Sequence, residues 1–130
     1  MLKLLTMNSL EELIYKIIMD NLHEYKIGKF KVKKVNRKTI FKILAKMLDI
    51  KFDDIYYKMH MKSSIFSKVM VRICKELNKQ YIISIHAHRG KQHTKYIFCN
   101  ENEKNEIEKI FKTRKTKRIT VIKCNGNDKI

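Results

Sequence analysis

Two histidines separated by one residue, His86 and His88, are the side chains best placed to bind a metal ion. They lie in a run rich in Tyr and Ile that predicts a β-strand, and residues two apart in a strand point to the same face. His93 and Cys99 follow, and imidazole and thiolate both suit zinc. Their spacing matches no closed zinc pattern. We therefore expect the histidines to be polar residues of a hairpin, and we predict neither a metal nor a cofactor.

The same histidine pair is similar to the His-hydrophobic-His motif of rolling-circle replication nucleases. Such enzymes also need a nucleophilic tyrosine on a downstream helix, and the only tyrosine after His88 is Tyr96, in the second strand of the predicted hairpin. The three glycines form no phosphate-binding loop, and no Ser-His-Asp arrangement is evident. We therefore expect a binding protein and not an enzyme, with the nuclease kept as the weaker alternative.

Positive charge dominates the chain. The 130 residues include 30 Lys and Arg against 13 Asp and Glu, which gives a net charge of +17. Residues 25–48 hold nine basic residues and residues 112–123 hold six, and neither segment contains an acid. Such segregation attracts a polyanion and speeds its encounter. Nucleic acid is therefore the expected partner, ahead of an anionic membrane or an acidic protein surface.

The length suits one domain, which we place at residues 1–124, followed by a disordered tail at 125–130. No apolar run is long enough to span a membrane, and the first residues lack the apolar region of a signal peptide. The expected location is the cytoplasm, or the host cytoplasm if the protein is viral. There Cys74 is expected to be a packed free thiol, while Cys99 and Cys124 could pair only if the C-terminal segment folds back.

Apolar periodicity predicts a mixture of helices and strands, and hence an α+β fold. In the helix at residues 63–78, one face carries the apolar stripe and the opposite face carries serines and basic residues. The predicted helices span residues 8–24, 36–49, 53–60, 63–78 and 101–112, and the predicted strands span 30–35, 50–52, 81–88, 94–99 and 119–123.

The spacing of Ile55, Tyr56, His60, Phe66 and Leu77 resembles that of the buried positions around the turn of winged helix-turn-helix DNA-binding domains. The order of elements over residues 36–99 resembles that family as well, and the size and style look like small regulators of archaeal viruses and plasmids. The resemblance implies a winged helix-turn-helix core at about 36–99, with extra N-terminal and C-terminal helices.

In that family the second helix of the pair enters the major groove, while the wing contacts the backbone or the minor groove. The resemblance therefore implies a sequence-specific double-stranded DNA-binding protein that regulates transcription, with the helix at 63–78 as reader and the hairpin at 81–99 as wing. Arg72 is the best candidate for a guanine contact, because its guanidinium can reach both acceptors of that base. The expected DNA-binding residues are Lys62, Ser63, Ser64, Ser67, Lys68, Val71, Arg72, Lys75, Arg89, Lys91, Gln92, His93 and Lys95.

The helices at 8–24 and 101–112 lie outside the expected winged core. They could pair two subunits into a homodimer and set two reader helices one DNA turn apart, or pack on their own chain. The alternative from another class is a winged-helix protein-interaction module, for example a viral factor that binds an acidic host protein.

Overall fold

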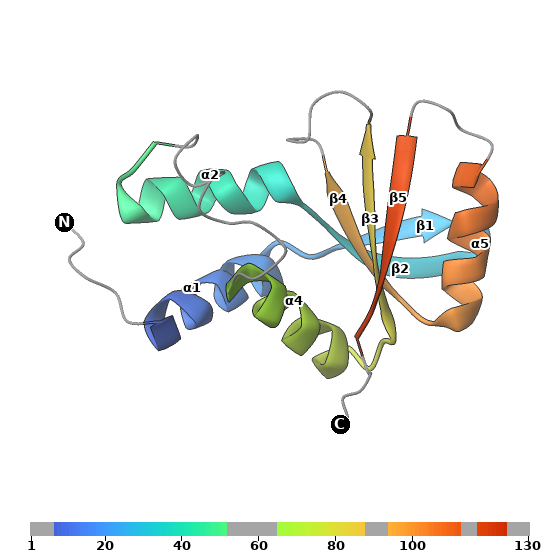
Figure 1. Cartoon of the computed structure of the whole chain (residues 1–130), viewed down its shortest axis with the longest axis horizontal. Helices are drawn as coiled ribbons and strands as arrows, with labels where there is room; N and C mark the ends of the chain where they lie inside the picture. Colours follow the sequence, from blue (N-terminus) through green and yellow to red (C-terminus); the bar gives the residue numbers. More distant parts are fainter. Residues whose placement is uncertain (1–6, 52–64, 88–93, 113–116, 125–130) are drawn as a thin grey trace.

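Helices cover both faces of one antiparallel sheet, so the chain has the predicted α+β class (Figure 1). The structure is a computed structural model, and it describes residues 7–51, 65–87, 94–112 and 117–124. Four helices and five strands lie in those segments. In chain order they are α1 (Met7–Asp20), β1 (His23–Ile27), β2 (Phe30–Asn36), α2 (Arg37–Leu48), α4 (Ile65–Glu76), β3 (Tyr81–Ala87), β4 (Lys95–Cys99), α5 (Glu101–Lys112) and β5 (Lys117–Lys123).

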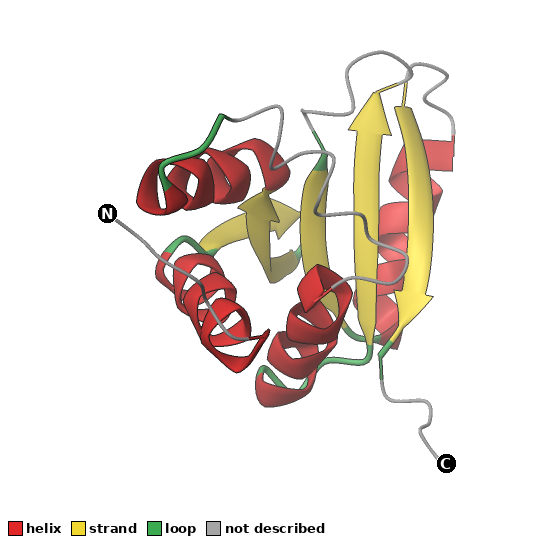
Figure 2. Cartoon of the chain, turned by 60° about the vertical axis from the view of Figure 1, so that its left-hand side comes forward, coloured by secondary structure: helices red, strands yellow, loops and turns green. Residues whose placement is uncertain are grey.

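The sheet has the strand order β1-β2-β4-β3-β5, and every neighbouring pair is antiparallel. Helices α1, α2 and α4 cover one face, and α5 covers the other (Figures 1 and 2). Because strand residues alternate between faces, β2, β3, β4 and β5 each contribute to two separate hydrophobic cores, whereas β1 contributes only to the one on the α5 face. In β4, Tyr96 and Phe98 point toward the three helices, whereas Ile97 and Cys99 point toward α5.

The larger core lies between the sheet and helices α1, α2 and α4. Phe66 of α4 packs edge-on against Phe41 of α2 at 5.5 Å and against Tyr96 of β4 at 5.6 Å between ring centroids. Such pairs add roughly 0.5–1.5 kcal/mol each beyond the burial of their area. Ile14 of α1 is also fully buried here. Contacts with α1, α2 and the sheet therefore fix the position of α4.

The smaller core lies between the sheet and α5. Ile107 and Phe111 are buried against Ile83, Ile97 and Cys99. The helix has the predicted bounds, and its narrow apolar seam is the predicted one. It packs on its own chain through this seam.

Three residues with positive φ shape the turns. Gly28 (φ 58) opens the two-residue turn between β1 and β2, as expected for a residue without a Cβ. Asp49 (φ 57) and Asn78 (φ 59) end α2 and α4, where short polar side chains tolerate the left-handed conformation.

Two predicted elements near the N-terminal half were wrong. The first helix ends at Asp20, and residues 23–27 form β1, which pairs with β2 across the Gly28 turn. Ile50 and Lys51 are not in a strand, because the Ile50 amide donates to the Ala45 carbonyl and closes the end of α2. Phe52, the predicted helix at 53–60 and the expected caps Ser63 and Ser64 lie outside the described residues.

The predicted hairpin at 81–99 forms, with Tyr81 opposite Cys99. Its strands do not project as an isolated two-stranded wing, because β2 pairs with β4 along one side and β5 pairs with β3 along the other. The described part of the hairpin is therefore the centre of the sheet. The basic tip at residues 88–93 and the tail at 125–130 lie outside the described residues.

The three cysteines are buried and free. Cys74 and Cys124 belong to the larger core, while Cys99 belongs to the α5 core on the other face of the sheet. The Cys99–Cys124 pairing considered from sequence therefore does not form in this structure. Among the described helices, none is long and apolar enough to cross a membrane.

Candidate nucleic-acid interface

The basic residues of α4 lie against acidic residues of α1. Lys68 Nζ is 3.3 Å from Glu11 Oε2, and Arg72 Nη1 donates to Glu12 Oε2 at 2.8 Å. Arg72 Nε also donates to Glu76 Oε2 at 3.3 Å, within α4. These contacts form because the apolar stripes of both helices enter the larger core, which sets the helices side by side (Figure 2). The guanidinium expected to contact guanine is thus already engaged by carboxylates.

Tyr15 of α1 extends this network. The Arg72 guanidinium lies 3.8 Å from the centroid of the Tyr15 ring, and the Tyr15 hydroxyl donates to Glu76 Oε1. That hydrogen bond lowers the pKa of Glu76 and raises the pKa of Tyr15. The hydrogen bond from Arg72 to Glu12 likewise raises the pKa of Arg72. All the groups are solvent-accessible, so an anion of high local charge can compete for Arg72.

Of the other predicted contact residues that the structure describes, three lie on α4 and one lies on the opposite face of the sheet. Ser67 is half-buried, and Val71 packs against the larger core. Lys75 is exposed on α4. Lys95 points to the α5 face of the sheet, because it alternates with Tyr96, and so lies across the sheet from α4. The other predicted contacts, Lys62, Ser63, Ser64, Arg89, Lys91, Gln92 and His93, lie outside the described residues.

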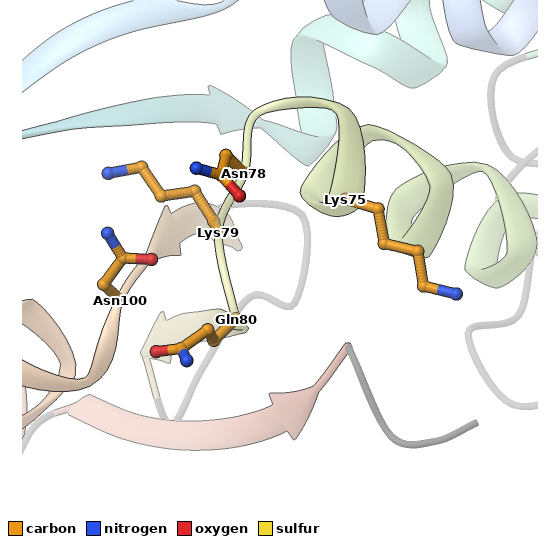
Figure 3. Close-up of a pocket in the computed structure, with 5 residues that line it drawn as sticks. All are labelled: Lys75, Asn78, Lys79, Gln80 and Asn100. Carbon is orange, nitrogen blue, oxygen red and sulfur yellow. The ribbon is translucent and has the colours of Figure 1, made fainter. Parts of the chain in front are cut away.

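A polar hollow lies where α4 meets β3 and β4 meets α5. Its lining consists of Lys75, Asn78, Lys79, Gln80 and Asn100. Lys75 points away from the other four side chains (Figure 3). Lys79 is held by Glu103 at 3.2 Å, with both side chains largely buried. The charge of Lys79 is therefore neutralised within the fold, and this hollow offers little attraction for an anion.

Two lysines that sequence reasoning did not connect lie together on the α5 face. Lys34 of β2 is opposite Ile97, and Lys95 is two residues before Ile97 on the neighbouring strand β4, so the lysines are diagonal neighbours. Burial lowers the pKa of Lys34, and the nearby charge of Lys95 lowers it further. Neither lysine forms an ion pair with a described residue. Lys34 instead lies over the Tyr25 ring, 5.0 Å from its centroid.

Two arginines lie at the same end of the sheet, on its opposite face. Arg37 begins α2 next to Asn36, whose strand partner is Lys95. Its Nε donates to the Tyr96 hydroxyl at 2.6 Å. Arg118 of β5 is exposed and is the strand partner of His86. We call Lys34, Arg37, Lys95 and Arg118 the basic sheet end.

The ion-paired acids lie elsewhere, whereas Glu24 of β1 is the strand partner of Lys33, next to Lys34. Every ion pair between described residues lies between α1 and α4, within α4, or around α5. The α5 pairs include Lys104 with Glu101 and Glu108. The described Asp and Glu side chains that pair with a base thus do so away from the basic sheet end.

Metal ligands are not assembled within the described segments. No group of three His, Cys, Asp or Glu side chains there could hold a metal ion. His86 is half-buried on the side of the sheet that carries Ile82 and Ser84, while His88 and His93 lie outside the described residues.

Comparisons with known proteins identify no relative of this chain. A scan against models of protein families finds no match, and searches of curated proteins and of solved structures find none either. Charge and geometry therefore have to indicate what this α+β protein binds.

Proposed function

We propose that the protein binds double-stranded DNA, with regulation of transcription as its use. The observation that carries this proposal is the basic sheet end, where Lys34 and Lys95 lie together and neither forms an ion pair with a described acid. A net charge of +17 supports the proposal, because basic side chains that contact DNA phosphates release condensed counterions, and this release favours binding.

Sequence reading by α4 belongs to the same proposal. On this view α2, α4 and the β3–β4 hairpin correspond to parts of a winged helix, and β1, β2 and β5 enlarge its sheet. Arg72 and Lys68 would exchange Glu12 and Glu11 for the DNA when a preferred site is bound. Breaking the two ion pairs should cost little stability, because both are solvent-accessible and exposed pairs contribute little.

Salt dependence tests duplex binding. Six to ten phosphate contacts would lower the affinity by roughly 10³ to 10⁵ between 50 and 200 mM salt. The measurement is a titration of a labelled random duplex by fluorescence anisotropy at several salt concentrations. A flat dependence, or no binding at 50 mM salt, would reject the proposal and favour the protein-interaction alternative.

Substitution of Arg72 tests the reader helix. DNA selected from a random pool supplies the preferred site, on which Arg72→Ala should cost about 1–3 kcal/mol and relax the sequence preference. Glu12→Gln is the matched variant, because it releases the guanidinium and should strengthen binding. Unchanged affinity and preference in Arg72→Ala would show that α4 is not the reader, while leaving duplex binding intact.

A further inference from the structure

We propose that Lys34, Asn36 and Lys95 form a binding site for a single backbone phosphate at the junction of β2 and α2. The inference rests on the proposed function and deepens it, because it places the anchoring contact on the sheet and not on α4. The ligand class is a phosphodiester or a phosphate anion of similar size.

The register of the strands brings the three residues together. Asn36 is the strand partner of Lys95, and Lys34 precedes Asn36 by two residues on the same face. Diagonal neighbours in an antiparallel pair have Cβ atoms roughly 7–8 Å apart or somewhat less, within the reach of two lysine side chains. Both lysines are only half-exposed, so their stems are held against the sheet. Their ammonium groups can therefore converge on one anion.

The arrangement is unfavourable without an anion. Like charges on adjacent strands repel, and the partial burial of Lys34 increases that cost. Other lysines in the fold avoid it: Lys79 and Lys104 each have a carboxylate within 3.2 Å. Tyr25 offers Lys34 a ring but no neutralising charge. A bound phosphate would supply the missing negative charge.

The start of α2 adds to the attraction. Its first turn contains no acid and carries Arg37 and Lys38, although a helix N-terminus already bears partial positive charge. Asn36 precedes the helix but makes no capping hydrogen bond with its side chain. The contrast with α5 is clear, because that helix has Glu101 and Glu103 in its first turn.

Asn36 also holds an unused polar atom. Its Oδ1 is buried and has no hydrogen-bond partner among the described residues. An amide oxygen only accepts, so the Asn36 side chain would have to rotate and turn toward the lysines to present its Nδ2 donors to a phosphate oxygen. A buried polar atom without a partner is costly, and a ligand at this junction would remove that cost.

The test compares two lysine pairs that carry the same charge. The double variant Lys34→Met/Lys95→Met removes the proposed site. The control Lys26→Met/Lys31→Met removes two exposed lysines that face each other across β1 and β2, on the other face of the sheet. Affinity for a labelled duplex at 100 mM salt is measured for both, with circular dichroism to show that each is folded.

We expect the site variant to lose roughly tenfold or more in affinity and to lower the salt slope by about one unit. The control should lose clearly less. Equal losses would overturn the site while leaving duplex binding standing, since position would then not matter.

A second measurement separates this site from the proposed function. Pyrophosphate is titrated into the wild-type protein while the lysine Nζ resonances are followed by NMR. The resonances of Lys34 and Lys95 are assigned by their loss in Lys34→Met and Lys95→Met. We expect the Lys34 and Lys95 signals to shift first. If no duplex binds but these signals shift, the DNA proposal fails and the phosphate site stands; if they do not shift, the site is rejected.

Discussion

The same residue type has different surroundings in different parts of this fold. Lys104 lies 3.1 Å from Glu108, and that hydrogen bond raises its pKa. Lys34 is partly buried beside Lys95, and its pKa is lowered. Composition alone treats the two lysines as equal contributions to net charge. Their environments make Lys104 a structural residue and Lys34 a candidate for binding.

The lowered pKa of Lys34 predicts a pH-dependent change in stability. The unfolded chain holds the Lys34 proton more tightly than the folded chain, so the contribution of Lys34 to the free energy of unfolding should rise as the pH increases through the range from the folded pKa to about 10.5. Cys99 contributes in the opposite direction over the same range, because burial raises its pKa to about 12, so the Lys34 contribution is read as the difference between wild type and Lys34→Met. Below that range Lys34→Met should be the more stable protein, because the repulsion with Lys95 is gone.

Urea unfolding at several alkaline pH values, with wild type and Lys34→Met compared at each, measures this difference. Lys31→Met is the control, because Lys31 is exposed on the same strand. A difference between wild type and Lys34→Met that does not vary with pH would contradict the prediction.

At the scale of elements, the periodic apolar patterns predicted the helices, but the sequence did not predict which strands pair. Helices α4 and α5 were predicted because Phe66, Met70 and Ile73, or Ile107 and Phe111, repeat at helical spacing. Strand β1 was missed because only Tyr25 and Ile27 mark its buried side, directly after a helix. The pairing of β2 with β4 joins segments distant in sequence, which no local pattern specifies. The neighbourhood of Lys34 and Lys95 therefore could not be predicted.

The turn between β1 and β2 should depend on Gly28. Gly28→Ala forces a side chain into a left-handed conformation, which should lower the free energy of unfolding by about 1–2 kcal/mol. The added Cβ would lie 3.1 Å from Glu106 Oε2, at the end of a side chain that can move away, so backbone strain is the main cost. Urea unfolding checks the value. Gly28→Asn should lower the free energy of unfolding by less than Gly28→Ala. Lys29→Ala, in the same turn, should change that free energy by less than about 0.5 kcal/mol. Equal losses in Gly28→Ala and Lys29→Ala would argue against the conformational explanation.

At the scale of the whole molecule, the fold sets the ion pairs of α1, α4 and α5 apart from the basic sheet end. Acids of α1 neutralise bases of α4, and acids of α5 neutralise Lys79 and Lys104. Lys34, Arg37, Lys95 and Arg118 lie at one end of the sheet, the lysines on its α5 face and the arginines on its other face. A long polyanion that reaches this end of the sheet meets basic residues from segments that are distant in the sequence. This separation follows from the sheet order and has no counterpart in the linear sequence.

The packing of α1 and α5 predicts the state of association. Both helices were candidates for pairing two subunits, yet α1 buries Ile14 and Ile18 in the larger core and α5 buries Ile107 in the smaller one. Among the described residues, the large hydrophobic side chains that are exposed are Met47 (49%) and Val121 (36%), on separate elements. Because the described part of the chain exposes no shared apolar surface, we expect the free protein to be a monomer of 15.7 kDa by light scattering. Twice that mass without DNA would contradict this prediction. Met47→Lys and Val121→Lys would then identify the interface, because only the variant whose substituted residue lies in the interface should restore the monomer.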